Sequence, residues 1–308
     1  MSLVRKTVIL AGYRCNNRCV FCMEADKRGL PVPDTRAVMR EMSAARKRGS
    51  SYLELIGGEA TIRDDFFQLL ACAKKLGYET VMMSTNGRLL AYPDFAEKIA
   101  ASGLNELVFS IHGHDAELHD SLTGVPGSFS QLIKGIENMR RLGFGRIHSN
   151  TTVVRQNYRR LEDIGRLLLS FGIKNSEFIF VDPNCGGAKN RFYELVPKIS
   201  AAAPYMRRLL DLGRKNGADG WAVRYVPLCF FKGYLDKISE LNEIRIFHTE
   251  HIAPDFTNYD VSGSRRDVGR VKAAACRKCA LGDLCEGIWK TYAEKYGTSE
   301  LKPIKWIS

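Results

Sequence analysis

The feature that most constrains the fold is a regular alternation of short hydrophobic segments with longer amphipathic segments over the first 182 residues. The short segments are rich in β-branched and aromatic residues, which favour strands, and they cover residues 6–11, 51–56, 79–84, 105–111, 146–154 and 176–181. The amphipathic segments have the hydrophobic period of a helix and cover 33–49, 63–77, 92–103, 127–143 and 157–172. Strands that alternate with helices of this length predict βαβ units and a parallel sheet.

Six strands are too few to close an eight-stranded barrel. We therefore expect an α/β fold with an open, partial barrel or a doubly wound sheet. Beyond residue 182 the pattern changes to one helical segment, 201–217, and one strand-like segment, 221–231, while 235–275 reads as irregular loop. These changes predict a large domain at 1–200 and a small C-terminal domain at 201–308.

The length and composition restrict the cellular setting. A chain of 308 residues that is 45% hydrophobic can bury a sizeable core. No stretch approaches eighteen consecutive apolar residues, and the first residues, MSLVRKTVILAGYRC, have no cleavage site after their short apolar run. Neither a membrane span nor a signal peptide is predicted. We expect a cytoplasmic protein, in which clustered cysteines are more often metal ligands or catalytic groups than disulfides.

Three of the nine cysteines fall within eight positions directly after the first predicted strand, at Cys15, Cys19 and Cys22. The carboxyl ends of strands are where α/β folds build their sites. A tight loop with three thiolates can bind three irons of a cubane cluster and leaves the fourth iron without a protein ligand. The alternative is a zinc site with a fourth ligand from elsewhere, although thiolate softness favours the cluster. A redox Cys-x-x-Cys pair does not need Cys15.

A second triplet lies near the end of the sequence, at Cys276, Cys279 and Cys285. It also lacks a fourth ligand nearby, and the distant Cys229 is the natural donor. Four thiolates suit either a closed [4Fe-4S] cluster or structural zinc. Cys72, near the apolar stripe of a predicted helix, reads as a small buried hydrophobe. Cys185 reads as an ordinary loop cysteine, with an auxiliary ligand or a substrate contact as alternatives.

Three further predicted strands end on glycine or polar residues, at the edge of the sheet that carries the first cysteine triplet. These residues are Gly57, Gly58 and Glu59 at the end of the second strand, Ser84, Thr85 and Asn86 at the end of the third, and Ser110 and His112 at the end of the fourth. The two glycines permit a close backbone approach or a positive φ. Glu59 provides an anionic acceptor suited to an ammonium group.

Together with the cysteine loop, these segments resemble the radical S-adenosylmethionine (SAM) superfamily. The resemblance covers roughly residues 5–182 and is carried by C-x3-C-x-F-C at 15–22, by GGE at 57–59 and by the order of the later strands. The stretch HDSLTGVPGSFSQLIKGIENM resembles the branch that contains the molybdenum-cofactor cyclase and the coenzyme-PQQ maturase. The spacing of the second triplet is similar to that of SPASM or twitch domains, which hold auxiliary iron-sulfur clusters.

The resemblance implies a partial (β/α)6 TIM-like barrel with a small C-terminal iron-sulfur domain. It implies a [4Fe-4S] cluster bound by Cys15, Cys19 and Cys22, with SAM chelating the fourth iron and breaking to a 5′-deoxyadenosyl radical. By position, the implied SAM contacts are Phe21 near the adenine, Glu59 with Gly57 and Gly58 at the methionine ammonium, and Ser110 and Asn150 at the carboxylate or ribose. Ser110 and Asn150 have hydrogen bonds to local backbone as an equal alternative. His112 and His114 are more simply ordinary loop histidines than substrate contacts.

The resemblance further implies one auxiliary [4Fe-4S] cluster on Cys229, Cys276, Cys279 and Cys285 that takes part in electron transfer. The expected substrate is a peptide or small natural-product precursor. The net charge of +12 suits an anionic substrate or an acidic flavodoxin- or ferredoxin-type reductant. Nucleic acid is permitted but not favoured, because the charges are spread along the chain. The alternatives are a radical SAM enzyme acting on RNA or a nucleotide and a zinc-stabilised binding protein without catalytic activity.

Overall fold

The computed structural model describes residues 3–305, which form two compact units. The first unit contains the chain up to Val20, Glu24–Asn150 and Ile246–Val261, and the second contains Phe21–Met23, Thr151–Arg245 and the chain from Ser262. Each unit therefore combines segments that are far apart in the sequence. These compact units have other bounds than the expected domains 1–200 and 201–308, each of which was expected to hold one cluster. The division into those two domains stays a prediction.

The first unit is built on parallel strands. They are β1 (Val4–Leu10), β2 (Tyr52–Ile56), β3 (Thr80–Thr85), β4 (Glu106–Ser110), the first residues of β5 (Ile147–Val153), β8 (Phe247–Ile252) and the short β9 (Thr257–Asn258). Their order is β5-β4-β3-β2-β1-β8-β9, and only β9 pairs antiparallel to its neighbour. The predicted parallel sheet is confirmed, with predicted strand bounds close to the observed ones.

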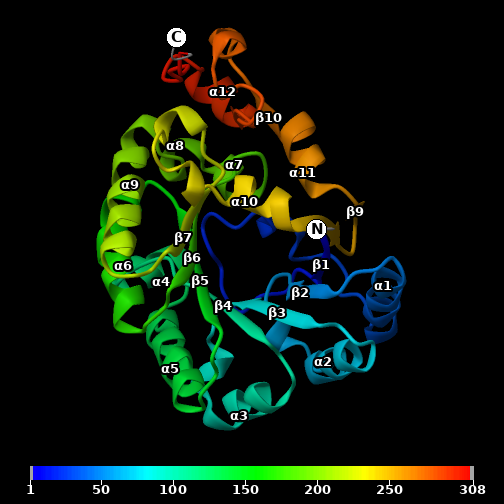
Figure 1. Ribbon diagram of the computed structural model, residues 1–308. Helices are drawn as coiled ribbons and strands as arrows, with labels where there is room; N and C mark the ends of the chain where they lie inside the picture. The colour runs from blue at the N-terminus through cyan, green and yellow to red at the C-terminus, as the bar shows by residue number, and fades with distance from the viewer. Residues whose placement is uncertain (1–2, 306–308) are drawn as a thin grey trace. The chain divides into compact units, whose positions relative to one another are not determined.

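Helices cover the outer side of these strands (Figure 1). The first unit contains α1 (Thr35–Lys47), α2 (Phe66–Lys75), α3 (Pro93–Ala101), α4 (Ala116–Thr123) and α5 (Ser128–Arg141), with 3-10 turns η1 (Ala25–Lys27), η2 (Ala60–Ile62) and η3 (Leu89–Ala91). Helix α1 begins where the Asp34 carboxylate accepts a hydrogen bond from the Ala37 amide at 2.8 Å, an N-cap that satisfies a free backbone donor. It buries Met42 against the core that contains Leu53 and Leu55.

The second unit contains the last residues of β5 followed by β6 (Asn175–Phe180) and β7 (Gly220–Arg224), which are parallel to each other. Its longer helices are α6 (Leu161–Ser170) and α9 (Ile199–Lys215), followed by α10 (Ser239–Ile246) and α12 (Lys290–Tyr296), with short helices α7 (Gly186–Asn190), α8 (Phe192–Leu195) and α11 (Val261–Ser264). Strands β10 (Arg270–Val271) and β11 (Ile288–Trp289) form an antiparallel pair. The remaining turns are η4 (Tyr158–Arg160), η5 (Leu228–Phe230), η6 (Leu235–Lys237), η7 (Arg265–Gly269) and η8 (Ala274–Lys278).

The prediction of irregular loop over 235–275 is wrong, because this segment contains α10, β8 and β9. Strand β8 pairs with β1 over six residues. Its sequence, FHTEHI, is polar, and Glu250 is fully buried in it. Arg48 donates to both oxygens of Glu250, at 3.2 and 2.7 Å, and Thr7 donates to one at 2.8 Å. A strand whose buried charge is neutralised by distant residues lacks the apolar pattern that predicts strands.

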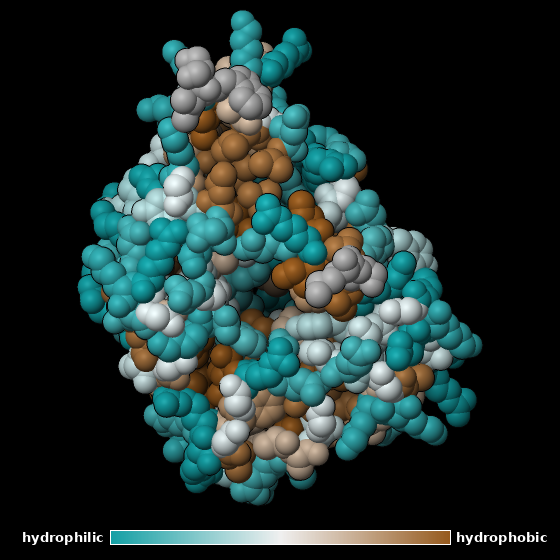
Figure 2. All heavy atoms as spheres, in the orientation of Figure 1, coloured by the Kyte–Doolittle hydropathy of each residue, from teal (hydrophilic) through white to brown (hydrophobic). Residues whose placement is uncertain are grey.

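The surface is mixed in character. On the face shown in Figure 2, hydrophilic side chains form most of the rim, and hydrophobic residues gather in the upper part, where Figure 1 places α12 and β10. Within residues 3–305, every helix is too short or too polar to cross a membrane.

Candidate active site and auxiliary cysteine site

The first cysteine triplet lies in the loop that follows β1, and its thiols are partly buried. Cys15 Sγ accepts a hydrogen bond from the Asn17 amide at 3.3 Å and a longer one from Asn86 Nδ2 at 3.8 Å. Asn86 Nδ2 also donates to Asn16 Oδ1 at 2.6 Å. Asn86, directly after β3, therefore holds the cysteine loop; its place at a strand end was the available sequence signal, but sequence reasoning assigned it no role.

Arg88 is a second residue that sequence reasoning missed. Its guanidinium donates to the Asn16 carbonyl, to Asn17 Oδ1 at 3.1 Å and to Gln131 Oε1 at 2.6 Å. One arginine thus ties the cysteine loop to α5. No sequence motif marks this role, because the partners lie more than forty positions away.

Gly57 and Gly58 bring the loop after β2 against the cysteine loop. The amide of Gly58 donates to the Gly12 carbonyl, and the amide of Glu59 donates to the Arg14 carbonyl, both at 2.8 Å. Gly57 has φ 143°, and a Cβ added to Gly58 would lie 2.0 Å from the Arg14 oxygen. The geometry shows both predicted properties of these glycines, a positive φ and a close backbone approach.

Glu59 is buried, with 3% of its surface exposed. Its Oε1 accepts hydrogen bonds from the Thr61 amide at 3.2 Å, the Thr61 hydroxyl at 2.7 Å and the Thr85 hydroxyl at 2.9 Å; Oε2 accepts one from the Asn86 amide at 2.7 Å. Burial raises the pKa of Glu59, and these donors oppose the rise. All four donors are neutral, and Oε2 keeps acceptor capacity. The carboxylate is therefore suited to receive a cationic group.

A cleft of about 620 Å³ connects the two features, because Cys15 and Glu59 both line it. Four arginines also line it, at Arg14, Arg18, Arg28 and Arg63. The Arg63 guanidinium is engaged by Asp65, at 2.7 and 2.6 Å, and by the Ala11 carbonyl at 2.6 Å. Arg14 and Arg18 are exposed. The cleft therefore offers a thiol, a carboxylate and positive charge to one ligand.

Ser110 and Asn150 are direct register partners on the neighbouring strands β4 and β5. Directly opposed residues on paired strands point to the same face of the sheet. The two polar side chains that were predicted to contact SAM therefore share one face at the carboxyl end of β4.

His112 packs inside the turn after β4. Its ring stacks on His119 with centroids 5.9 Å apart, and its backbone amide donates to His119 Nδ1 at 3.2 Å. Burial lowers the pKa of His112 to about 3 and that of His119 to about 4. Both rings are therefore neutral near pH 7, and their stacking and hydrogen bond stabilise the turn. His114, which lies beside Asp115 at 3.1 Å, is more exposed.

Cys22 and Phe21 belong to the second unit. Phe21 is buried, and the Cys22 carbonyl accepts a hydrogen bond from the Gly187 amide at 2.9 Å. A Cβ on Gly186, whose φ is 55°, would lie 2.2 Å from the same carbonyl oxygen. The loop that contains Cys185 therefore packs directly on the backbone of the third predicted cluster ligand. Cys72 is half-buried on α2, and burial raises its pKa.

The four C-terminal thiols line one small cavity in the second unit, together with Leu228, Leu281 and Leu301. The thiols are those of Cys229, Cys276, Cys279 and Cys285. The amide of Gly287 donates to Cys285 Sγ, and the amide of Ile304 donates to Cys279 Sγ, both at 3.4 Å. Burial raises the pKa of Cys229 and Cys285, while the amides of Lys302 and Leu228 lower it by hydrogen bonding. Hydrogen bonds of this kind are typical of iron-sulfur ligands.

Comparison with known proteins places the chain in a family. The model of the radical SAM superfamily matches residues 9–168. The AdoMet-dependent heme synthase of Methanosarcina barkeri is 29% identical over 226 residues, which are 67% of this chain and 64% of that protein. Mycofactocin maturase MftC of Mycolicibacterium smegmatis is 32% identical over 166 residues, 52% of this chain and 40% of that protein. The chain thus spans about two fifths to two thirds of the length of these relatives.

The fold is shared with a solved structure. Streptococcus suis SuiB bound to precursor peptide SuiA matches with a TM-score of 0.67 and 18% identity, over 96% of this chain and 74% of that one. The expected α/β fold is therefore confirmed. Because the family model covers more than half of its residues, the chain belongs to the radical SAM superfamily.

Proposed function

We propose that this protein is a radical SAM enzyme that removes a hydrogen atom from a peptide or small natural-product precursor. The observation that carries the proposal is the cleft lined by both Cys15 and Glu59. A thiol ligand for a cluster and a buried carboxylate without a cationic partner among its donors are the two groups needed to hold SAM at an iron.

The residues present fit this cofactor. Cys15, Cys19 and Cys22 would bind three irons of a [4Fe-4S] cluster, and the fourth iron would bind the amino and carboxylate groups of SAM. When bound and reduced, the cluster supplies the electron that cleaves SAM to methionine and a 5′-deoxyadenosyl radical, which abstracts the hydrogen atom.

The side chains bind and orient the cosubstrate. Glu59 would accept a hydrogen bond from an N–H of the methionine amino group through Oε2. Asn86 fixes the positions of that oxygen and of Cys15, because it contacts both. Phe21 provides an apolar surface near the adenine and excludes water. Ser110 and Asn150 lie on one face of the sheet and offer hydrogen bonds to the carboxylate or ribose.

We propose that Cys229, Cys276, Cys279 and Cys285 hold one auxiliary [4Fe-4S] cluster that takes part in electron transfer. Their shared cavity and the amide donors to sulfur support a cluster. A complete set of four protein ligands leaves no iron for substrate, which favours passage of an electron.

The assignment of a peptide-type substrate is supported by the similarity to a maturase and by the fold shared with a peptide-bound structure. A substrate of RNA or nucleotide type is the competing proposal. Family membership favours an enzyme over the zinc-stabilised binding protein. The reductant would be an acidic flavodoxin- or ferredoxin-type protein, because the chain carries a net charge of +12.

Anaerobic reconstitution tests the proposal. We expect about eight irons per chain, from two four-iron clusters, and 5′-deoxyadenosine when SAM and a reductant are added. The variant Cys276→Ala with Cys279→Ala should retain about four irons. Cys19→Ala should abolish 5′-deoxyadenosine formation, whereas the control Cys72→Ala, at a half-buried cysteine on α2, should retain both properties. Intact SAM in the wild-type reaction would refute the enzyme, and zinc in place of iron at the second site would refute the auxiliary cluster.

A further inference from the structure

A buried polar cluster lies at the carboxyl ends of β6 and β7 in the second unit. Asp182 follows β6 and Tyr225 follows β7. Tyr225 has φ 67°, which makes it the sole non-glycine residue with positive φ in the described range 3–305. Burial raises the pKa of Asp182, while the charge of Arg270 lowers it. Strained backbone at the edge where α/β folds build sites is typical of functional positions.

Three arginines lie over the Tyr225 ring, Arg224 and Arg265 at 5.6 Å and Arg270 at 5.2 Å from its centroid. Arg265 uses its Nε and Nη2 donors as a fork and binds both oxygens of Glu286, at 2.8 and 2.7 Å. Arg270 presents the same fork, but among the described residues neither its Nε nor its Nη2 has a hydrogen-bond partner. Arg265 and Arg270 therefore differ in their hydrogen bonding. The Nε and Nη2 donors of Arg265 bind a carboxylate, whereas the same two donors of Arg270 have no hydrogen-bond partner among the described residues.

Arg270 is almost completely buried, with 4% of its surface exposed. Its Nη1 donates to the Gly287 carbonyl at 3.3 Å, and its guanidinium lies 3.6 Å from the centroid of the Trp289 ring. The nearest carboxylate oxygen, Glu240 Oε1, is 3.9 Å from Nη2 and already accepts the Tyr225 amide. A buried arginine without a hydrogen-bonded anion is costly, so this geometry calls for a further partner.

Two more buried polar atoms of this cluster lack partners within the described residues, Trp289 Nε1 and Glu240 Oε2. Arg270 and Trp289 are register partners on β10 and β11, so their side chains lie on one face of this strand pair. The cluster therefore offers three buried N–H donors and one acceptor oxygen without partners. Buried polar groups are nearly always hydrogen-bonded in a protein's working state.

A cleft of about 710 Å³ in the second unit is lined by Gly269 and Lys290, the chain neighbours of Arg270 and Trp289. Its lining includes Lys189, Lys290 and Lys295, with Glu294 as its acidic residue. Asn184 and Gly269 also line it, and Asn184 Nδ2 donates to the Gly269 carbonyl at 3.2 Å. A Cβ at Gly269 would lie 3.2 Å from the Trp289 ring, so Gly269 lies between the cleft and that ring. Three lysines at its rim attract an anion.

The same loop lines this cleft and contacts Cys22, the third predicted cluster ligand. Asn184 lines the cleft, and Gly187, three residues later, donates to the Cys22 carbonyl. Three residues of chain span at most about 10 Å. Asn184 and Gly187 therefore lie within about 10 Å of each other.

We propose that the empty fork of Arg270, together with the Trp289 indole N–H, binds a carboxylate group of the substrate that enters through the lysine-lined cleft. The assignment to a substrate rests on the proposed radical SAM function, whereas the carboxylate site itself does not. A carboxylate matches the fork because the two parallel donors of a guanidinium edge meet its two oxygens. Glu240 Oε2 would accept an N–H of the same ligand.

Binding is measured on the full-length protein with N-acetylglycine, which carries a carboxylate next to an amide. The neutral N-acetylglycinamide and inorganic phosphate are compared with it at equal ionic strength. The dissociation constant follows from the rise of the unfolding temperature with ligand concentration. We expect saturable stabilisation by N-acetylglycine, none by the amide, and weaker stabilisation by phosphate.

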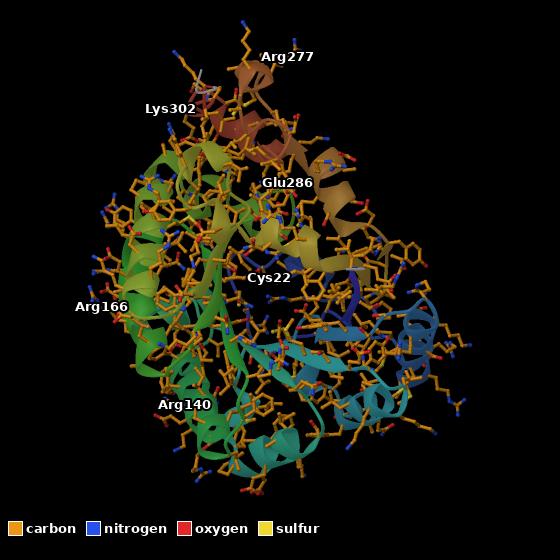
Figure 3. The ribbon with its side chains drawn as sticks, viewed as in Figure 1. Cys22, Arg140, Arg166, Arg277, Glu286 and Lys302 are labelled. Atoms are coloured by element: carbon orange, nitrogen blue, oxygen red, sulfur yellow. The ribbon has the colours of Figure 1, made fainter. Side chains whose placement is uncertain are left out.

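Three variants locate the site. Arg270→Met should abolish the response to N-acetylglycine, and Arg270→Lys, which cannot form two parallel bonds, should weaken binding by about tenfold. The ligand-free Arg270→Met protein should unfold at the same temperature as the wild type or higher, because a buried charge without a partner has been removed. The control Arg166→Gln changes an exposed arginine on α6 (Figure 3) and should leave binding unchanged.

Three binding results would overturn the proposal. They are an equal response to N-acetylglycine and its amide, an undiminished response in Arg270→Met, and a response to phosphate alone. A large loss of stability in ligand-free Arg270→Met would show that Arg270 is a structural ion-pair partner instead. Formation of 5′-deoxyadenosine is assayed separately, so failure of the radical SAM function and failure of the carboxylate site are distinguishable.

Discussion

At the scale of single residues, Glu59 links the two halves of the candidate site. Its carboxylate holds the loops after β2 and β3, because it bonds both Thr61 and Thr85, and it faces the cleft that Cys15 lines. Burial without a cation raises its pKa above the ordinary value of 4.5. An arriving ammonium group favours the charged carboxylate, so cosubstrate binding and the ionisation of Glu59 are linked.

This linkage predicts that SAM affinity rises with pH. A carboxyl group with a raised pKa stabilises the ligand-free fold most fully below pH 4.5, and this contribution is lost as the pH rises through the folded-state value. In the cluster-free protein the SAM nitrogen has no iron to bind and stays an ammonium between about pH 5 and about pH 7. Equilibrium dialysis of that protein should show tighter binding of SAM at higher pH. Glu59→Gln should weaken binding by about 2 kcal/mol and remove the pH dependence. The same slope in the variant would assign the linkage to another group.

Gly58 is a position at which the neighbouring backbone leaves no room for a side chain. We expect Gly58→Ala to lower the free energy of unfolding by about 3 kcal/mol, because its Cβ would overlap the Arg14 carbonyl at 2.0 Å. Urea denaturation measures this change. Gly29→Ala is the matched control, since a Cβ there meets no atom within 4 Å, and it should change stability by less than about 0.5 kcal/mol. Equal effects would show that the close approach does not matter.

The residues that sequence reasoning found and missed differ in a physical way. Cys15 and Glu59 could be predicted because they follow strands and belong to short local motifs. Arg88 and Arg270 could not, because their roles depend on carbonyls and rings that folding brings from distant positions. Asn86 is intermediate between these two groups of residues. Its position at the end of a strand could be predicted, but its hydrogen bond to Cys15 is visible only in the folded structure.

At the scale of elements, strands with regular apolar patterns were predictable and β8 was not. Strands β1 to β6 each carry buried apolar residues that the pattern reveals. In strand β8, Arg48, directly after α1, neutralises the fully buried Glu250, and Thr7 on β1 donates a hydrogen bond to it. An ion pair and a hydrogen bond replace hydrophobic burial at this position, and the two partners are 202 and 243 positions away.

Removing the Glu250 carboxylate should therefore loosen β8. We expect Glu250→Ala to lower the free energy of unfolding by about 3 kcal/mol, because Arg48 and Thr7 lose their acceptor. Denaturation monitored by circular dichroism measures the loss, and hydrogen exchange should show faster exchange in 247–252. Glu97→Ala, at an exposed position on α3, is the control with little effect. Unchanged exchange in β8 would mean that hydrogen bonding to β1 alone holds the strand.

At the scale of the whole molecule, the net charge of +12 governs encounters with partners. Long-range attraction between oppositely charged proteins raises association rates and weakens as salt shortens the Debye length. The net charge could be predicted fully from the sequence, because it depends only on the amino-acid composition. It could not predict the lysine-lined cleft, because Lys189 and Lys290 meet only in the folded second unit.

We predict that electron delivery by an acidic flavodoxin depends steeply on ionic strength. The second-order rate of flavodoxin-driven 5′-deoxyadenosine formation should fall by about tenfold between low and high salt, as for other electrostatically steered encounters. Single-turnover kinetics at several salt concentrations measure the slope. The same reaction driven by dithionite, a small reductant that needs no docking surface, is the control and should change little. An equal salt response with both reductants would place the effect at SAM or substrate binding instead.

The pairing of β1 with β8 has a consequence for the order of assembly during synthesis. The edge of β1 stays uncovered until a segment 243 residues later has left the ribosome, because Val4 pairs with Phe247 and Ile9 with Ile252. The cysteine loop, which begins where β1 ends, is thus attached to an unfinished sheet for most of translation. Iron delivered before release would meet three thiols on a loosely held loop, so insertion of the first cluster is expected to follow completion of the chain.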